Sequence, residues 1–120
     1  MGVWAVAGAL GVGLIAAPAA QATFHLIQIR EIYPGTLASP ESEYVELQMW
    51  SGGQNHVQGH FLRTYDAGGT AVATSTFPAD VPQGANQSTI VLATPKAEEQ
   101  FGIVGDASLS GPGLLSPAGG

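Results

Sequence analysis

In the segment ESEYVELQMW (41–50), two of the three glutamates, Glu43 and Glu46, lie three residues apart, a spacing that could support acid and base chemistry. Residues three apart share a face on a helix, but they point to opposite faces on a strand. Apolar and polar residues alternate here, which is the strand period. The apolar face carries Val45, Leu47 and Met49. We therefore interpret both glutamates as solvated or capping side chains, not a catalytic pair, and Glu31 could approach either one from a neighbouring strand.

Two histidines, His56 and His60, lie four residues apart, which is a zinc-binding spacing on a helix. Glycines surround them, so we do not expect a helix. On an extended chain, residues four apart are separated by about 13 Å, too far for both to bind one zinc ion. We therefore interpret them as surface or partly packed histidines.

Three aspartates, Asp66, Asp80 and Asp106, lie in or beside turns rich in glycine. Loop carboxylates of this kind bind calcium in some extracellular β-domains, but the ligand spacing of an EF-hand is missing. Turn formation is the role that we predict for them, with calcium binding as the alternative. The sequence predicts no catalytic residue, metal site or cofactor, and we expect the protein not to be an enzyme.

Aromatic side chains are the candidate partner-binding residues. Tyr44 and Trp50 share the strand face opposite the apolar one, and Tyr65 is expected to join them from the next strand. A row of this kind could stack sugars or anchor a protein partner. The alternative is that the rings pack beneath a loop.

Composition limits the fold and the class of partner. The chain has 120 residues, enough for one domain, and its 17 glycines, 8 prolines and 10% charged residues are typical of a turn-rich all-β protein. The net charge is −6, and the three cations, Arg30, Arg63 and Lys96, are too scattered for a nucleic-acid interface. Without cysteine, the chain has no disulfide and no thiolate site.

The hydrophobic pattern predicts five strands and one short helix. The strands are expected at 23–33, 43–50, 60–66, 70–77 and 88–93, with a hairpin closed by Gly68 and Gly69. The helix is expected at 95–101, because Thr94 is a good N-cap, Pro95 suits the first helical position and Gly102 can end the helix.

The first 22 residues resemble an export signal. Residues 3–20 are apolar, and Ala20 and Ala22 form the small-x-small pattern of a cleavage site. We expect cleavage after Ala22, so that residues 23–120 form the mature domain, secreted or held at the cell surface and not inserted in a membrane. No basic residue opens the segment, and an uncleaved membrane anchor is the alternative.

The C-terminal segment LSGPGLLSPAGG (109–120) has turn residues with no strand after them. Because turns normally connect elements, we expect a chain that is cut short before the last strands of its fold. A tail without regular structure is the alternative.

Several motifs together resemble the lamin-tail-like domain of secreted bacterial proteins, over about residues 26–104. His60 stands where that family usually has Trp. The motifs are IREIYPG (29–35), EYVELQ (43–48), VQGHFLRTYDAGG (57–69) and FPADVPQGANQSTIVLAT (77–94). The resemblance implies an immunoglobulin-like β-sandwich that serves as a non-catalytic module, often displayed outside the cell or attached to hydrolases.

These observations favour an exported β-sandwich module that interacts with a protein or glycan partner outside the cell or at its surface. One alternative is a calcium- or carbohydrate-binding module that uses the loop aspartates or the aromatic row. Another is the accessory domain of a hydrolase encoded beyond residue 120.

Overall fold

The computed structural model describes Gly2, residues 25–110 and Leu115. Apart from Gly2 and Leu115, the predicted export signal (1–22) and the last ten residues of the chain lie outside the described residues. No helix in the described part of the chain is long and apolar enough to cross a membrane.

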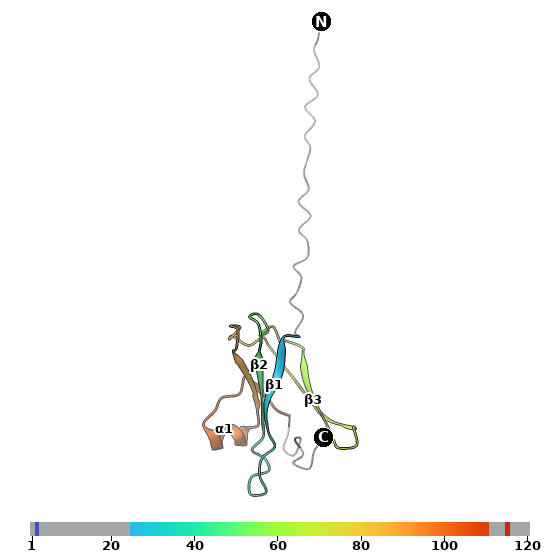
Figure 1. Cartoon of the computed structure of the whole chain (residues 1–120), viewed down its shortest axis with the longest axis vertical. Helices are drawn as coiled ribbons and strands as arrows, with labels where there is room; N and C mark the ends of the chain where they lie inside the picture. The colour runs from blue at the N-terminus through green and yellow to red at the C-terminus, as the bar shows by residue number, and fades with distance from the viewer. Residues whose placement is uncertain (1, 3–24, 111–114, 116–120) are drawn as a thin grey trace.

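The described residues form two β-layers, antiparallel except at β6, and one helix (Figure 1). The elements in chain order are β1 (Ile27–Tyr33), β2 (Tyr44–Met49), β3 (Phe61–Tyr65), β4 (Ala71–Thr76), β5 (Thr89–Ala93), α1 (Pro95–Phe101) and β6 (Ala107–Ser108). One sheet has the order β1-β2-β5-β6, and β3 and β4 form the second sheet. The all-β class, the sandwich-like arrangement and the helix at 95–101 are confirmed. β6 was not predicted, and it pairs in parallel with β5.

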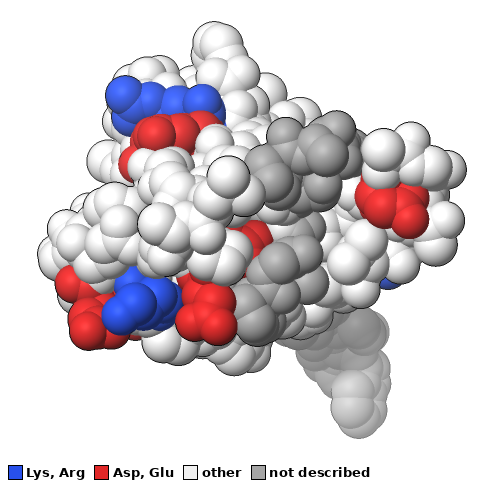
Figure 2. Space-filling model, turned by 90° about the horizontal axis from the view of Figure 1, so that it is seen from below, with Lys and Arg blue, Asp and Glu red and all other residues white. Residues whose placement is uncertain are grey.

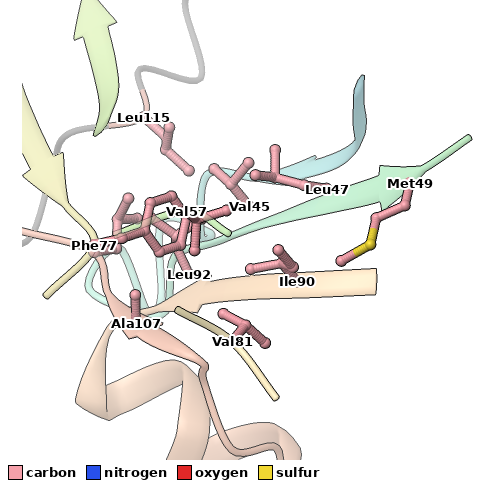
Figure 3. Close-up of a cluster of buried hydrophobic side chains, with 11 residues drawn as sticks. Val45, Leu47, Met49, Val57, Phe77, Val81, Ile90, Leu92, Ala107 and Leu115 are labelled. Carbon is pink, nitrogen blue, oxygen red and sulfur yellow. The ribbon is translucent and has the colours of Figure 1, made fainter. Parts of the chain in front are cut away.

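The alternation of β2 places its apolar residues in the core, as predicted. Val45 is 1% exposed and Met49 is completely buried. Facing residues of β5 and of the loops complete the cluster, in which the apolar side chains converge between the two sheets (Figure 3). The cluster consists of Val45, Leu47, Met49, Val57, Phe77, Val81, Ile90, Leu92, Ala107, Leu109 and Leu115.

A β-bulge in β1 changes which of its side chains face this core. Ile29 lies opposite Leu47, but the next pair is Glu31 with Glu46, so Arg30 is an extra residue. Regular alternation would put Ile29 and Ile32 on opposite faces of the strand. The bulge shifts the alternation by one residue, so both isoleucines lie on the core face, while Arg30 and Glu31 share the outer face with Glu46.

A turn at Pro34-Gly35 follows β1 directly. Gly35 has a φ of +77°, and a Cβ there would lie 2.7 Å from the carbonyl oxygen of Ser39. Only glycine combines this backbone conformation with so close an approach. The connection then bends back through a single bridge between Thr36 and Ser39 before β2 begins.

Thr94 joins the start of the helix to the start of β2. Its hydroxyl oxygen accepts hydrogen bonds from the backbone N–H of Ala97 (3.2 Å) and of Glu43 (3.1 Å). The same hydroxyl donates to the carbonyl oxygen of Glu41 at 2.6 Å. Because Thr94 is only 3% exposed, water cannot replace these bonds. Gly102 ends the helix in the left-handed conformation, as predicted.

Removing this hydroxyl should destabilise the whole domain. Thr94→Ala leaves two buried backbone donors and one carbonyl without their partner, so we expect a loss of about 2 kcal/mol in the free energy of unfolding. Thr94→Ser keeps the hydroxyl and should lose less than about 1 kcal/mol, for the missing methyl group. Urea denaturation measures both variants. Equal losses of unfolding free energy in the two variants would show that the methyl group of Thr94, not its hydroxyl, stabilises the contact between the helix and β2.

Candidate functional site

Glu43, directly before β2, and Glu46, within it, point to opposite faces as predicted, but only Glu46 is accessible to solvent. Glu46 lies on the outer face and pairs with Arg30 at 3.0 Å. Glu43 is completely buried, and its carboxylate accepts a hydrogen bond from the backbone N–H of Leu115 at 2.6 Å. Of the two roles predicted for Glu43, solvated or capping, the solvated one is therefore wrong. Glu43 shares the face of Val45, so its side chain enters the interior, where it holds a backbone segment.

Glu31 approaches Glu46 from the neighbouring strand, as the sequence suggested. The two residues are direct partners across the ladder of β1 and β2. Each carboxylate has its own partner, since Glu31 accepts a hydrogen bond from the Tyr44 hydroxyl at 2.8 Å and Glu46 binds Arg30. This arrangement gives a surface network of unlike charges and hydrogen bonds on the outer face of β1.

Tyr44 packs within an aromatic cluster and does not present a free ring. It stacks on Tyr33, with 5.3 Å between the ring centroids. Phe101 of α1 meets both rings edge-on, at 5.2 Å from Tyr33 and 5.8 Å from Tyr44. The hydrogen bond to Glu31 and the loss of hydration raise the pKa of Tyr44, so its hydroxyl stays protonated at neutral pH. The alternative interpretation, in which this ring is packed, describes it better.

The other two predicted aromatics do not adjoin Tyr44. Trp50 is 59% exposed, but it lies six residues along the chain, about 20 Å away at strand spacing. Tyr65 is in β3, which belongs to the second sheet, while the strands beside β2 are β1 and β5. The expectation that Tyr65 joins the row from the next strand is therefore wrong, because the chain crosses to the other layer after β2.

The histidines and aspartates tie loops together. The Nδ1 atom of His56 lies 3.0 Å from Oδ2 of Asp80, whose other oxygen accepts a hydrogen bond from the backbone N–H of Gln58. These bonds, that of His56 foremost, lower the pKa of Asp80 below its ordinary value of 3.8. Within the described part of the chain, no three His, Cys, Asp or Glu side chains are grouped to hold a metal ion.

The turn-forming role predicted for the aspartates is confirmed for Asp66 in the hairpin, whereas Asp106 binds the backbone of β5. One oxygen of Asp66 accepts hydrogen bonds from the backbone N–H groups of Gly68 and Thr70, both at 2.9 Å. Asp106 accepts a hydrogen bond from the backbone N–H of Val91 at 2.8 Å. These carboxylates therefore already bind the backbone that surrounds them.

An apolar cleft of about 180 Å³ lies between the two sheets, on the side where β1 adjoins β3. Ile29 is 50% exposed and Phe61 is 55% exposed at this cleft, although Ile29 is on the core face of its strand. Ile32, further along the same face, is 53% exposed. The residues that line the cleft are Ile27, Gln28, Ile29, Leu47, Phe61, Leu62 and Phe77.

The cleft is open because each sheet has an edge strand on this side. Among the described strands, β1 pairs only with β2, and β3 pairs only with β4. The sequence pattern did not predict this site. The signal that could have revealed part of it is the pair of adjacent charged residues, Arg30 and Glu31, which interrupts the alternation between Ile29 and Ile32.

Charged groups lie in small mixed clusters on the surface. Figure 2 shows Lys and Arg side chains next to acidic ones on the face that it presents, without a broad basic area. Arg30 pairs with Glu46, and Lys96 pairs with Glu99 at 2.9 Å. No protein-family model matches this chain, and neither a curated protein nor a solved structure shows significant similarity to it.

The bond between His56 and Asp80 should make stability depend on acid pH. Because the folded-state pKa of Asp80 is lowered, the ionised carboxylate stabilises the fold above pH 3.8, and this contribution disappears as the pH falls further. Asp80→Asn should therefore be less stable than the unmodified protein at pH 6, with a difference that closes below pH 3.8.

Urea denaturation over a pH series measures this difference. The matched control is the same pair of proteins carrying His56→Gln, in which the difference at pH 6 should shrink, since His56 is the main cause of the lowered pKa. A difference that stays constant from pH 6 to strongly acid solution would contradict this account of Asp80.

Proposed function

We propose that this chain is an exported, non-catalytic β-sandwich module that binds an extended segment of a protein partner along β1 and its apolar cleft. The observation that carries the proposal is the half-exposed state of Ile29 and Ile32 on the core face of β1, next to the cleft that Phe61 of β3 also lines. Large apolar side chains on the core side of a sandwich are normally covered, and a group of them left open is typical of an interaction site. The resemblance to secreted lamin-tail-like domains supports the same class of function.

The strand beside the cleft determines which kind of segment fits. The edge of β1 offers backbone groups to an added strand, and alternate side chains of that strand would point into the cleft. The partner segment is therefore extended, with apolar residues at every second position. Ile29 and Phe61 would contact those residues from the two sheets.

The structure gives less support to a calcium- or carbohydrate-binding function. Asp66, Asp80 and Asp106 each accept hydrogen bonds from backbone N–H groups, which uses the oxygens that a calcium ion would need. One ring face of Tyr44 is stacked on Tyr33 and Phe101 packs edge-on against the same pair of rings, so a sugar could not stack on that face. The protein-binding proposal therefore comes first.

Peptide selection from a random displayed library tests the binding site. We expect the full chain to select peptides with apolar residues at alternate positions, and Ile29→Asp should lose them. Val72→Asp is the matched control, because Val72 of β4 is also 50% exposed but does not line the cleft. Peptides that bind both variants equally well would place the binding surface elsewhere and overturn the proposal.

Export is tested by the N-terminus of the protein recovered from a secreting host. We expect the mature chain to begin at Thr23, because Ala20 and Ala22 fit the small pockets of a signal peptidase. Ala22→Arg should block this cleavage without changing the domain itself. Recovery of the unmodified chain from the membrane fraction with Met1 still attached would favour the anchor instead.

A further inference from the structure

We propose that the partner of β1 is a second copy of this chain, bound by antiparallel pairing of the two β1 strands. The two-fold axis passes between Arg30 and Glu31, and the two four-stranded sheets become one continuous sheet. This inference rests on the proposed function, since it names the partner that occupies the edge of β1. It is carried by the order of residues around the bulge.

The bulge makes the core face of β1 complementary to itself. In an antiparallel pair, residues directly opposite each other lie on the same face of the sheet. A two-fold axis between Arg30 and Glu31 places Ile29 of one copy opposite Ile32 of the other. In a regular strand these residues would point to opposite faces, but the extra residue at Arg30 places both on the core side. Each isoleucine, half-exposed in one copy, then meets an apolar partner.

The outer face is complementary in charge. The same axis places Arg30 of each copy opposite Glu31 of the other, which gives two pairs of unlike charges. A shift of the axis onto Arg30 would bring two arginines together and set Ile29 against Glu31. A shift onto Glu31 would bring two glutamates together and set Ile32 against Arg30. The charges therefore select one register among the neighbouring ones.

The groups that this pairing needs are accessible. The side chain of Arg30 is 54% exposed, although it binds Glu46, and a guanidinium has donors for a second carboxylate. Glu31 is exposed and uses one oxygen for the Tyr44 hydroxyl. Among the described strands, none lies on the outer side of β1. A second copy places a glutamate opposite Arg30 and an arginine opposite Glu31. A uniformly acidic segment would be repelled by Glu31, and a uniformly basic one by Arg30.

Charge reversal tests the pairing, because a misfolded variant would not regain dimerisation when it is mixed with the variant of opposite charge. In a dimer of the Arg30→Glu variant, both unlike pairs become pairs of carboxylates, and in a dimer of the Glu31→Arg variant both become pairs of guanidinium groups. Each variant alone should dimerise at least about tenfold more weakly than the unmodified chain. An equimolar mixture of the two variants restores both unlike pairs, so it should form a heterodimer with nearly the original affinity.

Sedimentation velocity of the full chain over a concentration series measures these dissociation constants. Lys96→Glu and Glu99→Lys on α1 are matched controls that change the net charge equally, and they should dimerise like the unmodified chain. Association through the apolar N-terminal segment would be the same in every variant, so it would not produce the pattern. An unmodified chain that stays monomeric, or a mixture that does not associate, overturns the self-pairing.

The two proposals can fail separately. If the chain stays monomeric but still selects alternating apolar peptides, self-pairing is wrong and the binding function stands. If the mixture of charge variants forms a dimer but no peptide depends on Ile29, the edge of β1 serves self-association and the apolar cleft is not a peptide site.

Discussion

The extra residue in β1 determines what each face of this domain presents. Without the bulge at Arg30, Ile32 would point outward and Glu31 would point toward the core of the sandwich, where a charge would lose its hydration. With the bulge, Ile27, Ile29 and Ile32 share the core face, and Arg30 reaches Glu46 on the outer face. One local irregularity therefore adds Ile32 to the apolar face of β1 and Glu31 to the charged surface behind it.

The core is anchored on one side and open on the other. Around α1, Thr94 and the buried Glu43 satisfy several backbone groups at once, and the apolar residues of β2 and β5 are almost completely buried. Toward β1 and β3 the apolar side chains are more exposed, and Ile29 and Ile32 of β1 are half-exposed. Stability and exposure are thus separated in space, which allows an apolar binding surface without a loosely packed core.

Much of the fold could be predicted from the sequence because its signals are local. Alternation in Tyr44–Met49 identifies a strand, and Thr94, Pro95 and Gly102 define the helix within a few residues. The bulge, the burial of Glu43 and the separation of Tyr65 from Tyr44 depend on pairing between distant segments. A sequence pattern cannot show that β2 is bordered by β1 and β5, so neither the aromatic cluster nor the cleft followed from it.

An exposed strand edge usually carries a bulge or a charge that discourages pairing with other chains. β1 has both devices, but its neighbouring charges have opposite signs. A partner strand with charges of one sign is repelled by either Arg30 or Glu31. A partner strand with a negative charge opposite Arg30 and a positive charge opposite Glu31 is attracted at both positions. Antiparallel pairing reverses the order of a sequence, so β1 itself satisfies this condition. The features that exclude other strands from this edge are therefore the ones that admit a second copy.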